Sequence, residues 1–178
     1  QTLRDFVNLA KTDYPAERYI IGFYSHGGAW LGVSDDMSHE DFLSPDDIGQ
    51  GLTQSGGVDL VCFTAPCIMG AFEMAYEIRG CADVMVASES NSSLQCWRSP
   101  LLELREILNS QPDTSNINIG KRTIEFMAAQ QLDWKHLLTM SAIQLDQTPA
   151  LADALDQMGS YYLQNLTDFQ LHMTATAG

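Results

Sequence analysis

His26 and Cys67 are the residues of this sequence whose types and positions are best suited to covalent chemistry. A thiolate is a strong nucleophile, but it needs a base or a cation near the sulfur, and an imidazole can supply either. Histidine and cysteine are nevertheless more often structural than catalytic, because a free cysteine commonly behaves as a small buried hydrophobe. Whether this pair can react therefore depends on the elements that hold it.

Short apolar runs precede both residues and are typical of buried strands. Residues 18–24 end just before His26, and residues 58–63 end just before Cys67. The carboxyl ends of parallel strands collect reacting groups at one edge of a sheet. The chain between the two residues is long enough for one helical crossover between parallel strands, so we expect the two strands to be neighbours.

Two local features favour catalysis over a structural role. His26 is followed by Gly27 and Gly28, whose backbone N–H groups a ligand can approach closely. Residues 69–79 are predicted to form a helix that Cys67 opens, and the dipole at a helix N-terminus favours a thiolate. Nucleophilic thiolate chemistry is therefore the hypothesis that these residues support.

The rest of the sequence alternates between helical and extended patterns. Ser44 is a candidate N-cap with Pro45 at the first helical position, and the glycine pair at 56–57 ends that helix. Residues 83–88 are predicted to form a third buried strand, whereas residues 31–41 are predicted to be a polar loop. The other predicted helices span residues 2–10, 100–108, 119–130 and 150–166, with a polar linker at 111–118. This alternation predicts an α/β fold with a parallel sheet flanked by helices.

The 178 residues are 45% apolar and carry a net charge of -14, a composition typical of a globular domain. We expect residues 1–110 to form the core that carries the His/Cys pair, and residues 111–178 to form a C-terminal, mainly helical part of the same domain. The negative charge argues against nucleic acid as a partner, because phosphates demand a basic face. No apolar run approaches the roughly 20 residues of a membrane-spanning helix, so we expect no membrane partner.

None of the four cysteines, Cys62, Cys67, Cys81 and Cys96, is part of a C-x-x-C pair. That spacing argues against a zinc knuckle or a thioredoxin motif. Two disulfides could form if the protein is exported, although a catalytic thiol would have to stay out of any bridge. We predict that Cys62 is a core thiol and that Cys81 and Cys96 are buried or half-buried.

The segments around both residues resemble the clostripain-like family of cysteine peptidases. YPAERYIIGFYSHGGAW is similar to the family's strand that ends in His-Gly, with a tryptophan shortly after. In the family, the nucleophile precedes a hydrophobic-Met pair and a Glu-x-Ala-Tyr-Glu helix, and here Cys67 is followed by Ile68-Met69 and then by EMAYE at 73–77. Trp97 and the segment 139–143 also resemble family positions. The resemblance implies a caspase-like three-layer α/β sandwich with a mostly parallel sheet, and hydrolysis of peptide bonds.

Carried over to this sequence, the resemblance makes Cys67 the nucleophile that forms an acyl-enzyme thioester. His26 becomes the acid/base that protonates the leaving amine, and the backbone N–H groups of Gly27 and Cys67 form the oxyanion hole. Family enzymes require no third triad member and no cofactor. Some use calcium, for which Asp35 and Asp36 are candidates here, although two adjacent carboxylates fall short of six to eight ligands.

Two departures from the family pattern stand out. The family usually has Asp-Ala-Cys at the nucleophile, with the Asp lining a pocket for Arg or Lys, whereas this chain has Ala65-Pro66-Cys67. We expect Ala65, Ser88 and Trp97 to line the substrate pocket and to accept neutral side chains. The family fold also begins with more N-terminal sheet, so we expect N-terminal strands to be missing from this chain and to be supplied by a separate chain or segment.

The resemblance further implies a peptide or protein substrate and a secreted or cell-envelope protein of a bacterium. One alternative is a catalytically silent or altered-specificity clostripain-like binding domain, which the changed pocket would suit. A second alternative is an esterase, because His-Gly-Gly echoes an esterase oxyanion loop. That fold needs a G-x-S-x-G elbow, which this sequence lacks.

Overall fold

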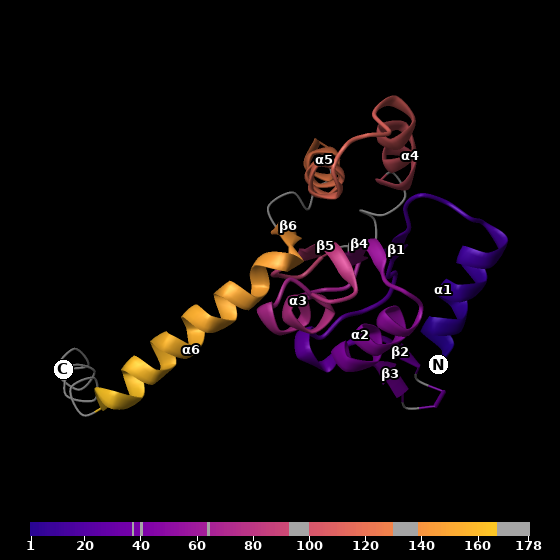
Figure 1. Ribbon diagram of the computed structural model, residues 1–178. Helices are drawn as coiled ribbons and strands as arrows, with labels where there is room; N and C mark the ends of the chain where they lie inside the picture. Colours follow the sequence, from indigo (N-terminus) through magenta and orange to yellow (C-terminus); the bar gives the residue numbers. More distant parts are fainter. Residues whose placement is uncertain (37, 40, 64, 93–99, 130–138, 167–178) are drawn as a thin grey trace. The chain divides into compact units, whose positions relative to one another are not determined.

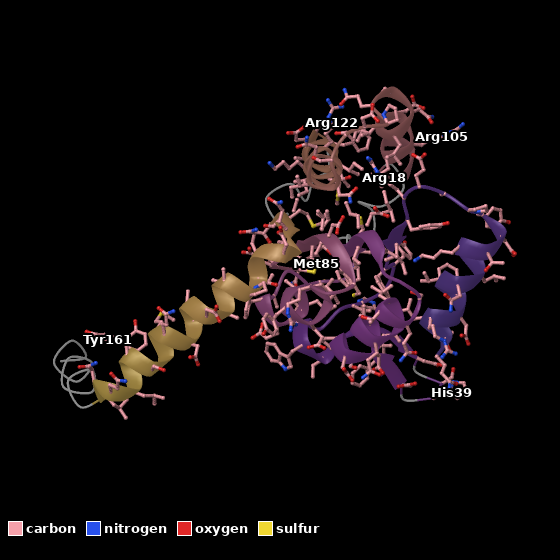
Figure 2. The ribbon with its side chains drawn as sticks, viewed as in Figure 1. Arg18, His39, Met85, Arg105, Arg122 and Tyr161 are labelled. Carbon is pink, nitrogen blue, oxygen red and sulfur yellow. The ribbon has the colours of Figure 1, made fainter. Side chains whose placement is uncertain are left out.

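The structure is a computed structural model that describes residues 1–36, 38–39, 41–63, 65–92, 100–129 and 139–166, with residues 100–103 described by their backbone alone. The chain divides into two compact units, Gln1–Asp146 and Gln147–Gly178. The first unit contains a four-stranded sheet with helices on both faces, and the second contains the helix α6 (Thr148–Gln164) (Figure 1). The expected division into a core of residues 1–110 and a mainly helical part of residues 111–178 stays a prediction.

The sheet has the strand order β1 (Ile20–Gly22), β4 (Val58–Phe63), β5 (Ala82–Ser88) and β6 (Met140–Gln144). The first three strands are parallel, and β6 runs antiparallel to β5. All three apolar runs of the sequence therefore become parallel strands. The prediction that the strands before His26 and Cys67 are neighbours is confirmed by the pairing of β1 with β4.

Alternate side chains of the sheet enter two separate cores. Val61 and Phe63 of β4 pack with residues of α2 (Pro45–Gln54) and α3 (Phe72–Ile78). Leu60 and Cys62 of the same strand pack with residues of α4 (Pro100–Ser110) and α5 (Asn116–Ala129). Because successive side chains of a strand point to opposite faces, a strand that is apolar at every position needs a helical layer on each face. Figure 1 shows α2 and α3 below the sheet and α4 and α5 above it.

The start of α2 follows the sequence signal closely. Ser44 accepts a hydrogen bond from the Asp47 N–H at 3.1 Å, and the Asp47 carboxylate accepts one from the Ser44 N–H at 3.0 Å. Together they form a capping box, with Pro45 in the first turn. The helix ends at Gln54, just before Gly56 and Gly57, both of which have positive φ. On its outer side α2 packs against α1 (Thr2–Asp13).

The prediction of a polar loop at residues 31–41 is wrong. A 3₁₀ helix (Ala29–Leu31) leads into an antiparallel hairpin of β2 (Val33–Asp36) and β3 (Asp41–Leu43). The hairpin forms because Val33, only 2% exposed, enters the core while Leu43 pairs with it across the ladder. Gly32 permits the tight junction, since its φ is +110° and an added Cβ would lie 2.0 Å from the Leu43 carbonyl oxygen.

Other boundaries also shifted. The second half of the chain was predicted to be mainly helical, yet β6 forms there as an edge strand of the sheet. Helix α5 begins at Asn116, inside the predicted linker, where the Asn116 amide donates to the Asp83 carboxylate at 2.7 Å. Within the described ranges, no helix combines the length and the apolar character that crossing a membrane would take.

Candidate active site

The ends of β1 and β4 lead side by side into the candidate site. Gly22 pairs with Cys62 in the parallel ladder. Beyond the ladder, the Phe23 N–H donates to the Cys62 carbonyl oxygen at 2.9 Å, and the rings of Phe23 and Phe63 stack with centroids 4.9 Å apart. The loops that carry His26 and Cys67 therefore leave the sheet from the same edge, as expected for reacting groups in a parallel sheet.

Gly27 makes the close contact between these two loops. A Cβ added to it would lie 2.7 Å from Pro66 Cβ, 2.8 Å from the Cys67 carbonyl oxygen and 3.0 Å from Met69 Cγ. Real Cβ atoms essentially never show contacts under 3.0 Å. Only glycine therefore lets the loop after His26 lie directly against the turn that carries Cys67.

The predicted oxyanion donors are the backbone N–H groups of Gly27 and Cys67. Neither donates to a backbone acceptor within the described part of the chain. The next N–H groups are occupied, because Gly28 donates to the Gly32 carbonyl at 2.9 Å and Ile68 donates to the Ser90 carbonyl at 3.0 Å. An oxyanion could thus be bound by the first N–H of each loop, and this role stays a prediction.

The His26 side chain is exposed and lines a hollow of about 240 Å³. The opposite wall of the hollow is formed by the 3₁₀ helix and the β2–β3 hairpin. The loop is tied to that hairpin by the Gly28–Gly32 hydrogen bond and by a bridge between Gly27 and Val33. The loop that carries His26 therefore contacts the Cys67 turn through Gly27 and also lines a separate concave surface.

Cys67 is half-buried beneath the segment that follows β5. Its Sγ accepts a hydrogen bond from the Ser92 N–H at 3.3 Å and lies 3.6 Å from the Ser92 carbonyl oxygen, to which the thiol can donate. The Ser92 hydroxyl donates to the Ala65 carbonyl oxygen at 2.6 Å. The backbone of Ser92 therefore forms part of the immediate surroundings of the Cys67 sulfur.

The helix after Cys67 begins later than predicted. Residues from Cys67 to Gly70 form turns, and α3 starts at Phe72 with Ala71 as its N-cap. The prediction that Cys67 opens this helix is therefore wrong, and the helix dipole cannot be invoked for the thiolate. Gly70 is the physical reason, since its N–H donates to the Ser88 carbonyl at 2.8 Å and a Cβ added to it would lie 2.9 Å from the Ser88 carbonyl carbon.

Strained backbone occurs in both loops of the site. Ile68 has a φ of 49°, Ala29 a φ of 54° and Ser34 a φ of 61°, and these are the positive-φ residues other than glycine in the described ranges. For a β-branched residue such as isoleucine, this conformation is a genuine outlier. Such strain persists only where surrounding contacts over-determine it, and it clusters at functional sites.

The other described thiols lie in apolar surroundings. Burial raises the pKa of the Cys62 thiol to about 12 and that of the Cys81 thiol to about 11. Both residues were predicted to be buried, and both are. Their protonated thiols are poor nucleophiles near neutral pH, which leaves Cys67 as the reactive candidate among the cysteines that the structure describes.

The three residues predicted to line the substrate pocket are placed differently from one another. Ala65 is 2% exposed and packs into the core with Leu60 and Cys62. Ser88 is fully buried, with its hydroxyl 3.1 Å from the Thr139 hydroxyl. Trp97 lies outside the described residues. Their role in substrate binding stays a prediction.

The two candidate calcium ligands lie in the hairpin beside His26. The Asp36 carboxylate pairs with the His39 ring at 2.8 Å, and this hydrogen bond, with one from the Ser38 N–H, lowers the pKa of Asp36. Asp35 is exposed and lines the hollow. No group of three or more His, Cys, Asp or Glu residues suited to a metal ion occurs in the part of the chain described, and calcium binding stays a prediction.

Two features of the site were missed from the sequence. The contact between Ser92 and Cys67 joins residues far apart in the chain, and a run of serine and asparagine carries no signal for it. The hollow beside His26 requires the β2–β3 hairpin, whose strands are too short for a clear alternating pattern.

Comparison with known proteins places this architecture in a family. The family model described as the clostripain family matches residues 1–177. Clostripain from Hathewaya histolytica is 32% identical over 108 residues, which cover 49% of this chain and 20% of that protein. The chain thus spans about a fifth of the length of this curated relative.

Two solved structures of a secreted C11 cysteine protease from Bacteroides thetaiotaomicron share the fold. The form in complex with an irreversible peptide inhibitor has a TM-score of 0.66 and 21% identity, covering 85% of this chain and 46% of that chain. The other structure, named iotapain, has a TM-score of 0.70 and 16% identity, and the match covers 89% of this chain and 48% of that chain. The expected caspase-like α/β sandwich with a mostly parallel sheet is confirmed. Because the family model covers nearly the whole chain, this protein belongs to the clostripain family.

Proposed function

We propose that this protein is a cysteine endopeptidase that hydrolyses peptide bonds through Cys67 and His26. The observation that carries the proposal is the contact of Gly27 with Pro66 and Cys67, which sets the loop of the histidine against the turn of the cysteine. Membership of the clostripain family supports the same reaction. The solved relative that was captured with an irreversible peptide inhibitor adds support from a shared fold.

In the proposed reaction, Cys67 Sγ attacks the carbonyl carbon of the scissile bond while its proton passes to His26. The N–H groups of Gly27 and Cys67 bind the resulting oxyanion. The C–N bond then breaks as His26 gives its proton to the leaving amine, and a thioester remains on Cys67. A water molecule that loses a proton to His26 attacks the thioester, the C–S bond breaks, the thiol regains a proton and the carboxylic product leaves.

Paired substitutions test this proposal. Cys67→Ala should abolish cleavage of a casein or peptide-library substrate, because it removes the nucleophile. His26→Ala should lower kcat by at least about 10²-fold, the usual scale for a lost acid/base. Cys81→Ala and His39→Ala are matched controls that remove the same side chains elsewhere and should retain turnover. Cleavage near the wild-type rate in a folded Cys67→Ala variant would overturn the proposal.

We further propose that Arg and Lys are not strongly preferred before the scissile bond. A pocket for a cation needs a compensating carboxylate, since an unpaired buried charge costs several kcal/mol. Ala65 stands at the position where the family has such a group, and its side chain packs in the core. Matched fluorogenic substrates that end in Arg, Lys, Ala, Gln or Leu test this. A preference for Arg or Lys above about 100-fold, roughly 2.7 kcal/mol, would contradict it.

The proposed substrates are peptides or proteins, and the proposed location is outside the cell or in the cell envelope. The secreted Bacteroides relative supports this location. The thiolate mechanism needs no metal, so activity should survive EDTA, while a role of Asp35 and Asp36 in calcium binding would appear as a calcium-dependent melting temperature. Detection of the protein in the culture medium or envelope fraction of its native host would test the location.

A further inference from the structure

The hollow beside His26 has walls from two parts of the chain. One wall is His26 with Gly27 and Gly28, and the other includes Leu31, Val33 and Phe42 of the 3₁₀ helix and the hairpin. The lining is mainly apolar, with His26 and Asp35 as its ionisable residues, and the volume is about 240 Å³. Pockets for drug-sized ligands measure roughly 300–1,000 Å³, so this hollow has room for a single apolar side chain.

The residues that line the hollow are separate from those that surround the Cys67 thiol. Neither the turn from Ala65 to Gly70 nor the segment from Ser88 to Ser92 contributes to its lining. Gly27 meets the Cys67 turn, while the same short loop forms a wall of the hollow. The loop of His26, Gly27 and Gly28 thus contacts the Cys67 turn through Gly27 and also forms a wall of the hollow.

The place of the hollow next to His26 indicates which part of a substrate would occupy it. If His26 protonates the leaving amine, the residue that carries this amine must lie next to the imidazole, on the side away from Cys67. We propose that the hollow is a specificity pocket for the side chain of the residue directly after the scissile bond, and that it takes an aliphatic or aromatic side chain. This inference rests on the proposed function, since it assumes the acid/base role of His26.

The walls of the pocket are held in place by backbone contacts. The Gly28 N–H donates to the Gly32 carbonyl at 2.9 Å, and Gly27 bridges to Val33. Gly32 cannot carry a side chain, because a Cβ there would lie 2.0 Å from the Leu43 carbonyl oxygen. The pocket is therefore formed before substrate binds, which lowers the ordering cost of binding.

The charge around the pocket favours the same class of side chain. Asp35 is exposed and also lines the hollow, and the chain carries a net charge of -14. An acidic side chain entering the pocket would lose hydration and meet a carboxylate of like charge. Aspartate and glutamate should therefore be the poorest residues at this position.

Internally quenched peptides that differ only in the residue after the scissile bond test the pocket. We expect kcat/KM for Leu or Phe to exceed that for Gly by about tenfold, the lower end of what an apolar pocket achieves, and Asp to fall below Gly. Phe42→Asp, on a side chain that is 47% exposed, should lower the Leu-to-Gly ratio at least about fivefold. Leu31→Ala, at a second exposed position, should lower the same ratio without adding a charge.

Phe6→Ala is the matched control, since Phe6 is 61% exposed on α1, and it should leave the Leu-to-Gly ratio unchanged. A coumarylamide substrate, which has no amino acid after the scissile bond, separates the two proposals. If the wild-type protein cleaves the coumarylamide but shows no preference among the quenched peptides, the proposed specificity pocket is wrong and the proposed peptidase activity is supported. If wild type cleaves neither kind of substrate, both proposals fail. A Leu preference that survives both Phe42→Asp and Leu31→Ala would also overturn the pocket.

Discussion

Replacing Gly27 with alanine would place a methyl group inside the contact between the two loops of the candidate site. Its Cβ would lie 2.7 Å from Pro66 Cβ and 2.8 Å from the Cys67 carbonyl oxygen. Neither neighbour can rotate away, because one belongs to a proline ring and the other to the backbone. The loop that carries His26 must therefore move away from Cys67.

The size of this movement follows from the contact distances. The closest contact is about 0.7 Å short of the 3.4 Å at which ordinary van der Waals contact begins. A misplacement of about 1 Å can cost about 10²-fold in rate, so we expect kcat to fall by about 10-fold to 100-fold. Overpacking typically costs about 1–3 kcal/mol, which corresponds to a loss of several degrees in Tm for a unit of this size.

The assay combines steady-state kinetics on a fluorogenic peptide with thermal unfolding of the same samples. Gly80→Ala is the matched control, because nothing lies within 4 Å of a Cβ added there, and both kcat and Tm should stay near wild type. If Gly27→Ala keeps kcat within about twofold of wild type and also keeps the wild-type Tm, the two loops are not in contact at Gly27. A fall in Tm with unchanged kcat would mean that the contact stabilises the fold but does not affect the rate of the reaction.

Three further predictions concern strain and thiols. Ile68→Gly should be more stable than Ile68→Ala by about 1 kcal/mol, because glycine accepts the φ of 49° without the Cβ clash; equal midpoints in urea would contradict this. Iodoacetamide at neutral pH should modify Cys67 before Cys62 and Cys81 in the folded protein, and mass spectrometry would reveal the reverse order. Because burial raises the pKa of Cys62 to about 12 from 9.0, the unfolded chain loses this proton first, and the free energy of unfolding should fall as pH rises from about 9 to about 12. Cys62→Ala should flatten this decline by up to about 1.4 kcal/mol per pH unit, and an unchanged slope in urea titrations at several pH values would count against it.

The sheet was largely predictable because its strands are buried on both faces. Residues 58–63 are apolar at almost every position, and the observed β4 has the same bounds as the prediction. The start of α2 was also predictable, since Ser44 and Pro45 act through local geometry. By contrast, β6 is an edge strand of short, mixed composition, and its formation depends on pairing with β5, which no local pattern reveals.

The candidate site was predictable in its residue types and less so in its surroundings. His26 and Cys67 are placed by the ends of β1 and β4, and the parallel pairing of those strands follows from their apolar sequences. The start of α3 could not be placed correctly, because the contact of Gly70 with Ser88 comes from a distant strand. The hairpin beside His26 likewise depends on the packing of Val33 into the core.

The geometry of the candidate site rests on backbone contacts more than on side chains. Gly27 sets the distance between the loops through a proline ring and a carbonyl oxygen, and the strands below are fixed by their ladder. The side chain at Ala65 takes no part in that contact, because it packs into the core on the other side of the turn. A different side chain at this position therefore need not disturb the contact of Gly27 with the Cys67 turn. Loss of the family's acidic side chain at Ala65 is thus compatible with the proposed reaction at Cys67.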